Sequence, residues 1–225
     1  TAIPTLGVYD DSNIGGCAGT DAAIHRAIIL NVPCINQLLE GETAVDRTFG
    51  TAYAQADFID DDEQRLRYKL NVSYDRTNVR NTYFVPEFEM GFFFNNTSAQ
   101  YDDGQNIFTT AVVEHTITYE REFGERHDMT LLAGQTFQKG SSSFRNGFTE
   151  QLSTPYFPVL DNGSNKTASG EEFENVLTSY FGRLNYNFDD RYLLTATVRR
   201  DGSSRFAPSN RYGNFPSASL GWNVH

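Results

Sequence analysis

Apolar and polar residues alternate along the last part of the chain, from Asn175 onward, so that every second side chain is apolar. The alternation holds over three stretches and is interrupted at Asp189-Asp190 and in the polar segment after Arg199. A period of two predicts strands with one apolar and one polar face. Phe181 and Leu193 are apolar exceptions on the polar side. The apolar positions of the three predicted strands are Tyr180, Gly182, Leu184, Tyr186 and Phe188, then Tyr192, Leu194, Ala196 and Val198, then Ala218, Leu220, Trp222 and Val224.

The same alternation predicts four further strands upstream, which gives seven in all. One ionisable residue, His115, falls on an otherwise apolar face. Phe188 and Tyr192 flank the Asp189-Asp190 turn, where the aromatic girdle of a membrane barrel would lie. The four upstream strands are predicted at 48–58, 65–75, 107–122 and 128–139.

The strand predicted at 65–75 has the cleanest pattern. Arg65, Arg67 and Lys69 lie on one face, and apolar residues such as Leu70 lie on the other. A Lys or Arg side chain on the lipid face of a membrane barrel costs about 2–4 kcal/mol at mid-depth. If the sheet crosses a membrane, the face with the three cations must therefore line a wet lumen.

The connections between the predicted strands alternate between short and long. Short turns are expected at Asp60–Glu63, Phe123–Arg126 and Asp189-Asp190, whereas Thr77–Asn106 and Gly140–Glu174 read as long polar and aromatic excursions. Short turns at one end and long loops at the other are typical of bacterial outer-membrane barrels, in which the short turns are periplasmic. A soluble antiparallel sheet with one face packed on a core remains the alternative.

Residues 1–47 show no clear period, and we expect an irregular excursion there, with strands over residues 48–225. Asp21–Leu30 is predicted to be a short helix with Asp21 as its N-cap, ended by Pro33.

Two stretches, SYFGRLNYNFDDRYLLTATVRRDGSSRF and NRYGNFPSASLGW, resemble the barrel segment of SusC/RagA-type TonB-dependent outer-membrane transporters of Bacteroidota. The segment FGERHDMTLLAG at residues 123–134 resembles a hairpin of the same family. The resemblance is nearly continuous over about fifty C-terminal residues. It is fair from Gly50 onward and weak before that.

The resemblance implies a nutrient importer for oligosaccharides or peptides in the outer membrane of a Gram-negative cell. Such a transporter is capped by a SusD-type surface lipoprotein and energised by TonB–ExbB–ExbD. Residues 48–225 would be part of the receptor β-barrel, forming wall and outer loops. Seven strands leave edges that lipid does not tolerate, so a larger barrel of about 22 strands around a plug is expected. We therefore expect the chain to be an internal part of a longer polypeptide, with the plug and the TonB-contacting segment elsewhere.

Composition narrows the class of partner. The chain has 225 residues, a formal net charge of −11, 39% hydrophobic residues and 14% aromatic residues. The negative charge and the lack of a basic stretch argue against nucleic acid as a partner. The sequence contains no run of 18 apolar residues, so it predicts no transmembrane helix.

The chemistry-bearing residues predict neither catalysis nor a cofactor. No nucleophile-elbow, zinc-protease or phosphate-loop motif is present, and the four histidines lack metal-ligand spacing. Asp10–Asn13 and Asp161–Gly163 loosely resemble calcium loops but lack the full ligand spacing. Cys17 and Cys34 are compatible with a disulfide outside the cytosol or with free thiols, and His25 alone does not complete a metal site.

Three groups of candidate site residues follow. The Arg200–Arg205 motif is either a structural turn, which the Asp-Gly pair favours, or a contact at the outer rim. Polar residues of the strands would face the lumen and line either the plug or the solute path. The loop aromatics would either stack on sugar rings or pack, against the loop itself or against a lid protein. The lumen-facing set is Arg67, Lys69, Glu114, Glu120, Arg183, Asn185 and Arg199; the loop set is Phe148, Tyr156 and Phe157; the motif residues are Arg200, Asp201, Gly202, Ser203, Ser204 and Arg205.

Two other functional classes stay open besides the TonB-dependent importer. A passive outer-membrane porin or channel would share the barrel and would lack a plug. A soluble secreted glycan-binding β-domain or adhesin would share the strands and would need no detergent. Flanking sequence separates the importer from the porin, and detergent requirement separates both from the soluble domain.

Overall fold

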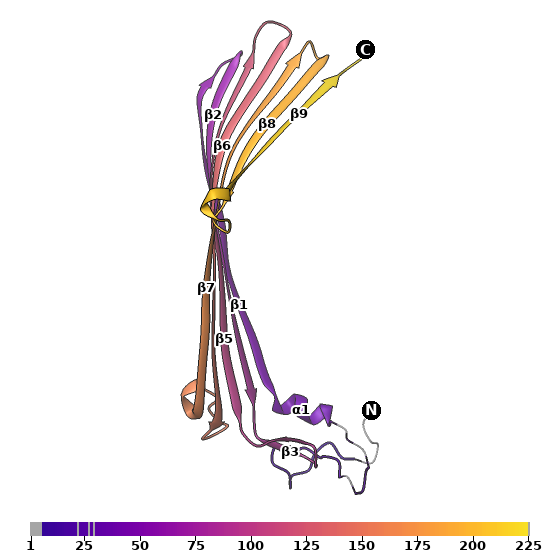
Figure 1. Cartoon of the computed structure of the whole chain (residues 1–225). Coiled ribbons are helices and arrows are strands. Elements are labelled where there is room, and N and C mark those ends of the chain that lie inside the picture. The colour runs from indigo at the N-terminus through magenta and orange to yellow at the C-terminus, as the bar shows by residue number, and fades with distance from the viewer. Residues whose placement is uncertain (1–5, 22, 27, 29, 225) are drawn as a thin grey trace. The chain divides into compact units, whose positions relative to one another are not determined.

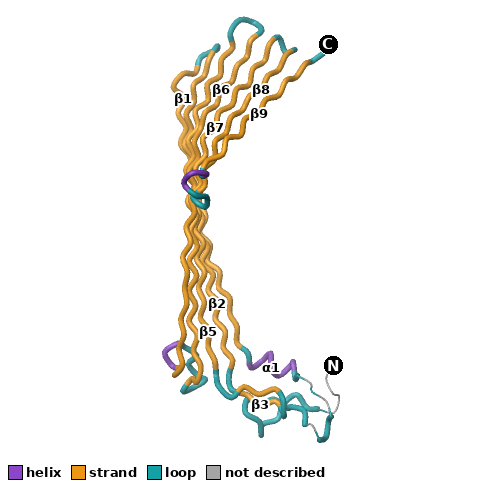
Figure 2. The backbone as a smooth tube through the Cα atoms, in the orientation of Figure 1, coloured by secondary structure: helices purple, strands orange, loops and turns teal. Residues whose placement is uncertain are grey.

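A computed structural model describes residues 6–21, 23–26, 28 and 30–224. The described chain is dominated by a seven-stranded antiparallel sheet with the strand order β1-β2-β5-β6-β7-β8-β9 (Figures 1 and 2). The predicted all-β class and the number of long strands are therefore confirmed, and the sheet is open rather than closed. The seven strands are β1 (Glu40–Asp60), β2 (Gln64–Val85), β5 (Gln100–Glu122), β6 (His127–Leu152), β7 (Gly163–Phe188), β8 (Tyr192–Ser203) and β9 (Tyr212–Trp222).

Most of the strands are longer than the alternation predicted. β2 continues to Val85 and β5 begins at Gln100, so most of the expected 77–106 excursion is strand. β6 and β7 likewise take up most of the expected 140–174 excursion. Alternation identifies a strand only where its two faces differ in polarity, whereas backbone pairing does not depend on that difference.

The connections that remain are short. The segment 86–99 holds a two-stranded antiparallel pair, β3 (Phe88–Met90) with β4 (Phe94–Asn96). A 3-10 turn, η1 (Leu160–Asn162), precedes β7, and a second, η2 (Pro208–Asn210), lies between β8 and β9. At the other strand ends, Asp189 and Asp190 both have positive φ values, 59° and 50°. Asp and Asn tolerate this left-handed conformation better than most residues do, which suits the predicted Asp-Asp turn.

The helix lies later in the chain than predicted. The described residues between Asp21 and Leu30 form turns, in which the Asp21 carboxylate accepts hydrogen bonds from the Ala23 and Ile24 amides; residues 22, 27 and 29 lie outside the described residues. The helix is α1 (Val32–Leu38), and Pro33 lies in its first turn instead of ending a helix. Proline is favoured there because the amides of the first helical turn have no intrahelical partner.

Contacts divide the chain into two compact units. The first comprises the described residues up to Asp46 together with Asn78–Ile107 and Ser143–Glu172. The second comprises Arg47–Thr77, Phe108–Ser142 and the described residues from Phe173 onward. The buried side chains of the first unit form two small clusters, one around Cys17, Cys34, Ile35 and Met90, and one around Phe84, Ala99 and Tyr101.

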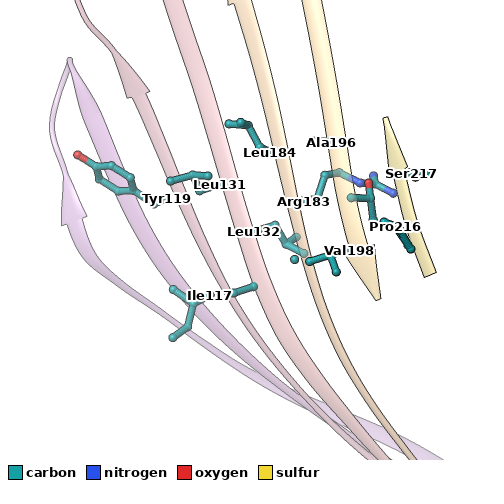
Figure 3. A pocket seen from close by; sticks show the side chains of 13 residues that line it. Ile117, Tyr119, Leu131, Leu132, Arg183, Leu184, Ala196, Val198, Pro216 and Ser217 are labelled. Carbon is teal, nitrogen blue, oxygen red and sulfur yellow. The ribbon is translucent and has the colours of Figure 1, made fainter. Parts of the chain in front are cut away.

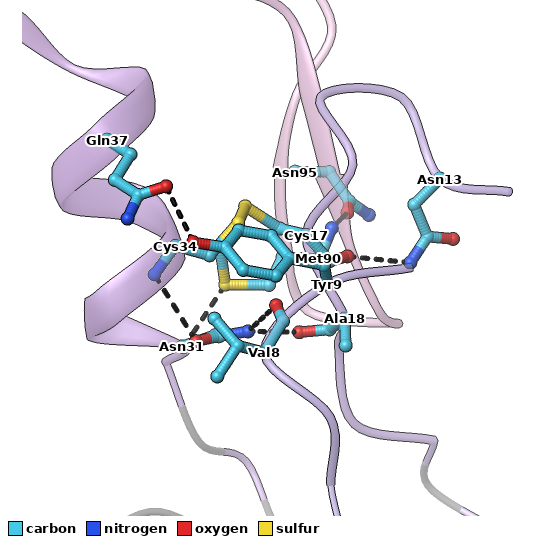
Figure 4. Close-up of a disulfide and its surroundings, with 10 residues drawn as sticks. All are labelled: Val8, Tyr9, Asn13, Cys17, Ala18, Asn31, Cys34, Gln37, Met90 and Asn95. Atoms are coloured by element: carbon cyan, nitrogen blue, oxygen red, sulfur yellow. Dashed lines mark hydrogen bonds between the residues drawn. A yellow bond between two sulfur atoms is a disulfide. The ribbon is translucent and has the colours of Figure 1, made fainter. Parts of the chain in front are cut away.

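A disulfide between Cys17 and Cys34 closes the N-terminal part of the first unit (Figure 4). The two Cα atoms are 5.6 Å apart, and both residues are buried. Asn31 organises the backbone beside the disulfide. Its side-chain amide donates to the carbonyls of Val8 at 2.7 Å and Ala18 at 3.0 Å, while its oxygen accepts from the Cys34 amide. The sequence alone did not decide between a disulfide and free thiols, and the structure contains the disulfide.

No helix in the described part of the chain has the length and apolarity needed to cross a membrane.

Candidate functional site

The register of β7, β8 and β9 sorts their side chains onto two faces. Gly182 pairs with Val198, which pairs with Pro216, and these residues share the face that we call the apolar face. The neighbouring pairs, Arg183 with Thr197 and then Ser217, lie on the opposite face, which we call the polar face. The alternation predicted from the sequence is therefore present as two continuous rows across three strands.

Aromatic rings gather on the apolar face next to the short turns. Tyr192 of β8 pairs with Trp222 of β9, and its ring centroid lies 6.3 Å from that of Phe188. On β6 and β7, His127 Nδ1 and the Tyr186 hydroxyl are 2.6 Å apart. The predicted girdle at the Asp189-Asp190 turn is thus wider than the two residues that the sequence suggested.

His115, the ionisable residue on the apolar face, has a hydrogen-bond partner there. Its Nδ1 lies 2.6 Å from the Tyr68 hydroxyl of β2. A buried or lipid-facing polar group is costly without such a partner. The pairing explains how an imidazole is accommodated among apolar neighbours.

A shallow groove of about 630 Å³ runs across the apolar face (Figure 3). Gly182 lies within it and has only backbone and a Val198 methyl group, both 3.7 Å away, near the place where a Cβ would stand. The small residues Ala133 and Ala196 extend the hollow, and larger residues surround it. The surrounding apolar side chains are those of Ile117, Tyr119, Leu131, Leu184, Val198 and Pro216.

On the polar face, most of the predicted lumen-facing charges have partners on neighbouring strands. Arg67 donates to Asp57 at 2.7 Å, and the Lys69 ammonium lies 5.0 Å from the centroid of the Tyr53 ring. The pairing of Arg65 with Glu120 joins β2 to β5 at 3.7 Å.

The same face continues through β6, β7 and β8. Thr136 donates to Glu114 at 3.1 Å, and Thr195 donates to Asn185 at 3.1 Å. Arg199 donates to Asp201 at 2.7 Å and to the buried Ser179 hydroxyl at 3.1 Å.

Arg183 differs from the other predicted lumen-facing residues. Within the described part of the chain, its guanidinium makes no ion pair or side-chain hydrogen bond, although it is exposed on the polar face. Six residues of the predicted set therefore contact a side chain of a neighbouring strand. Within the described chain, the Arg183 guanidinium has no such contact and is available to another molecule. That any of them contacts a solute stays a prediction.

Aromatic residues on the polar face were not among the predicted site residues. Tyr53 under Lys69, Phe49 at 5.8 Å from Arg47, and Phe215 opposite Arg199 lie there. The signal was present in the sequence as an aromatic residue at a polar position of an alternating strand.

The Arg200–Arg205 motif closes the β8 end by specific contacts. The Ser204 amide donates to the Val176 carbonyl at 2.9 Å, and the Ser204 hydroxyl accepts from the Val176 amide at 2.8 Å. The Tyr212 ring covers Gly202, leaving no space for a Cβ there. The Asp201 carboxylate holds Arg199, whereas the guanidinium of Arg200 lies 4.8 Å from the Tyr212 centroid. These contacts describe a turn, and the choice between a structural and a binding role stays a prediction.

Of the predicted loop aromatics, two project from the connection between β6 and β7. Tyr156 is 85% exposed and Phe157 is 69% exposed. Asn162 holds this connection, because its side-chain amide donates to the carbonyls of Thr154 and Phe157, both at 3.0 Å. Phe148, the third, lies within β6 and is half-buried.

Electrostatics at this connection are local. The Lys166 ammonium donates to Asp161 at 2.7 Å, and this hydrogen bond, with the charge of the ammonium, holds the pKa of the Asp161 carboxyl below its ordinary value. In the described part of the chain, no three histidine, cysteine or carboxylate side chains come together as metal ligands.

Comparison with known families decides what this two-faced sheet belongs to. The model of the TonB dependent receptor-like β-barrel family matches residues 30–225. The chain belongs to this family. The sequence resemblance to SusC/RagA-type receptors of Bacteroidota is confirmed by its relatives and structural neighbours.

Relatives with a TonB-dependent receptor name come from two organisms. TonB-dependent receptor P26 of Formosa agariphila is 38% identical over 122 residues, which is 49% of this chain and 12% of the relative. TonB-dependent receptor SusC of Bacteroides thetaiotaomicron is 47% identical over 81 residues, which is 36% of this chain and 8% of SusC. The chain thus spans about an eighth or less of these two TonB-dependent receptors.

Solved structures share the barrel fold. The RagAB peptide importer in its open-open state superposes with a TM-score of 0.74 at 19% identity, covering 83% of this chain and 20% of that chain. The closed-closed state gives the same TM-score of 0.74. At this identity the likeness shows the fold alone.

Proposed function

We propose that this chain is part of the wall of a TonB-dependent outer-membrane nutrient importer of the SusC type. The observation that carries the proposal is the sheet with one apolar, aromatic-edged face and one face of cross-strand charge pairs. A sheet of this kind suits a boundary between lipid and a polar lumen. Membership of the TonB dependent receptor-like β-barrel family supports a barrel of the TonB-dependent class.

In the proposed transporter, the chain from Glu40 onward, where β1 begins, contributes barrel wall and outer loops, and the segment before Glu40 forms an excursion tied by the Cys17–Cys34 disulfide. The apolar face lies against outer-membrane lipid, and Arg183 is the wall cation that meets the solute or the plug. The chain carries no chemistry of its own in this scheme, since the solute is moved rather than transformed.

The proposed partners follow from the relatives. A SusD-like surface lipoprotein would cap the barrel, and TonB–ExbB–ExbD would act through an N-terminal part of the longer protein. The solute is a peptide or an oligosaccharide. Peptide is favoured by the structural likeness to the RagAB peptide importer, and oligosaccharide is compatible with the exposed Tyr156 and Phe157, because aromatic faces stack on sugar rings.

Uptake in whole cells tests the proposal. A strain that lacks the full-length gene is complemented with it, and uptake of labelled peptides and labelled oligosaccharides of similar mass is compared. We expect complementation to restore uptake of one class and the loss of TonB to abolish that uptake. Uptake that persists without TonB would instead assign a passive porin. A full-length protein found in the soluble fraction would contradict the membrane location.

The loop aromatics are tested in the same cells. Tyr156→Ala with Phe157→Ala removes the two exposed rings, and we expect the half-saturating solute concentration to rise roughly thirtyfold, since stacking on each ring is worth about 1 kcal/mol and two rings are lost. Phe144→Ala on β6 is the matched control, because Phe144 is also exposed but lies within a strand. Equal uptake by both variants would remove these rings from the proposed binding surface.

A further inference from the structure

Three arginines have neighbouring backbone positions at the end of the β8–β9 hairpin. Arg200 is on β8, and Arg205 and Arg211 lie in the connection to β9; all three are exposed. The backbone holds Arg205 and Arg211 close to the strand end, because the Ser203 hydroxyl accepts from the Arg205 amide and the Ser203 amide donates to the Arg211 carbonyl. We call these three residues the arginine patch.

The arginine patch has no acidic neighbour. Among the described residues, no carboxylate lies within ion-pair distance of any of the three guanidinium groups, whereas Arg199 on the other face is bound to Asp201. This is unexpected in a chain with a net charge of −11, in which carboxylates outnumber cations. Three unneutralised cations at one strand end therefore form a site that attracts an anion.

The depth of the patch matches a membrane surface. On β8, the apolar row that starts at Tyr192 ends before Arg200, which lies eight residues further along the same face. At about 3.3 Å per residue, the strand between Tyr192 and Arg200 is about 26 Å long. A tilt of about 40° reduces this to about 20 Å, so the Arg200 guanidinium is within a side chain's length of the border of an apolar band about 25 Å tall. The patch therefore lies at the border opposite the short turns, where the extracellular leaflet has its headgroups.

The apolar groove leads directly to the patch. Val198 and Pro216, which line the groove, are followed on the same face by the paired row of Tyr180, Arg200 and Asn214. Figure 3 shows Val198 and Pro216 side by side in the groove. An acyl chain lying in the hollow at Gly182 would place its headgroup at Arg200.

We infer that the arginine patch and the groove together bind a phosphorylated glycolipid of the extracellular leaflet. The guanidinium groups of the patch hold the lipid phosphate by charge-assisted hydrogen bonds, and the groove holds an acyl chain. The exposed Phe206, between Arg205 and Arg211, adds an apolar side chain at the headgroup level, as aromatic residues at membrane interfaces do. The inference rests on the outer-membrane location proposed above.

Native mass spectrometry of the full-length transporter tests the inference with purified lipid A as the probe. Phosphorylated lipid A and the same lipid after dephosphorylation are added to delipidated wild type and to an Arg200→Gln/Arg205→Gln/Arg211→Gln variant. Each arginine near a lipid headgroup contributes about a fivefold effect, so we expect the variant to bind phosphorylated lipid A roughly a hundredfold more weakly. The wild type is expected to bind the dephosphorylated lipid as weakly as the variant does.

Two further variants keep the test informative. Arg205→Gln/Arg211→Gln leaves the stacked Arg200 in place and should weaken binding about thirtyfold. Arg121→Gln/Arg191→Gln changes two arginines near the short turns, each of which lies against an aromatic ring, at Phe123 and Tyr192. This control should bind phosphorylated lipid A as the wild type does.

Several outcomes would overturn the inference. Equal binding of both forms of lipid A, equal binding by all variants, or displacement of the lipid by millimolar inorganic phosphate would each do so. A variant that retains lipid A but loses the surface lipoprotein would assign the patch to a protein partner. Fractionation of the same cells tests the outer-membrane location separately from the lipid site. A wild type absent from the outer membrane contradicts the proposed function, and a wild type present there with unchanged lipid binding in the variants contradicts only this inference.

Discussion

The ring of Phe181 on β7 lies against Gly134 on β6, in the space where the Cβ of any other residue would stand. Phe181 is the apolar exception on the polar face, and Gly134 is the position that accepts it. A glycine in a strand leaves backbone uncovered, and an aromatic ring from the neighbouring strand covers it here. The two residues thus form one packing unit across the β6–β7 pair.

Gly134→Val should destabilise the barrel wall. The added side chain would collide with the Phe181 ring, and its Cβ would stand 2.9 Å from the His115 carbonyl oxygen. Overpacking of this kind typically costs about 1–3 kcal/mol. Gly50→Val is the control, because nothing lies within 4 Å of that Cβ position. Urea unfolding of the full-length protein in detergent should show a lower midpoint for Gly134→Val alone, and equal midpoints would contradict the packing described.

Leu70→Arg should impair membrane assembly far more than Lys69→Ala. Leu70 lies on the lipid side of β2 in this account, where an arginine costs about 2–4 kcal/mol at mid-depth. Lys69 is on the polar face above the Tyr53 ring, and its removal forfeits one exposed cation–π contact of about 0.5–1 kcal/mol. The amount of folded protein in isolated outer membranes measures the difference. Similar amounts of the two variants would mean that the faces are assigned the wrong way round.

Loss of the disulfide should loosen the N-terminal part of the first unit. Cys17→Ser with Cys34→Ser opens a loop whose closure is worth roughly 3 kcal/mol in the chain-entropy model. The two cysteines are also part of the buried cluster with Ile35 and Met90. Hydrogen exchange should accelerate at the Ile35 and Leu39 amides, whose hydrogen bonds to the Asn31 and Ile35 carbonyls close the turns of α1. Amides of β8 serve as the internal control, and an unchanged rate in α1 would show that the cluster holds without the bond.

Arg183→Glu and Arg199→Gln should separate transport from stability. Arg183 makes no contact with another charged side chain of the described chain, so its replacement should leave stability within about 0.5 kcal/mol. Reversal of its charge should alter uptake of an anionic solute roughly fivefold, which corresponds to about 1 kcal/mol.

Arg199→Gln breaks a partly exposed ion pair with Asp201 and a hydrogen bond to Ser179, and should cost up to about 1 kcal/mol of stability. Uptake per folded molecule and the urea midpoint are measured for both variants. Loss of stability in the Arg183 variant with normal uptake would reverse the roles given to the two residues.

Much of the sheet could be predicted from alternation alone, because the faces of a strand in lipid differ sharply in polarity. The register of Tyr180 with Arg200 follows from that difference and from the short turn at Asp189-Asp190, which joins β7 to β8. The strand extensions could not be predicted in this way. In the sequence from Asn78 to Val85 the alternation breaks down, since Tyr83, Phe84 and Val85 follow one another, so this segment reads as a loop while its backbone is paired.

Other parts depend on contacts between residues far apart in the sequence. The helix position turned on Pro33, which can end one helix or begin another, and the contact between the Asn31 side chain and Cys34 favours the second. The fit of Phe181 to Gly134 depends on the β6–β7 register. Alternation predicts the face on which each residue lies but not the residue with which it pairs. The partners of Arg67, Glu114 and Arg199 likewise became visible only once their neighbouring strands were placed.

Accessibility of single positions along β8 shows whether the apolar face of the sheet lies against lipid. Spin labels are placed one at a time at residues 194 to 198 of the full-length protein in lipid vesicles, with the native disulfide kept oxidised. Labels at Leu194, Ala196 and Val198 should collide with oxygen dissolved in the lipid, and labels at Thr195 and Thr197 should collide with a water-soluble nickel reagent. Equal exposure of all five positions to the water-soluble reagent would contradict a lipid-facing sheet.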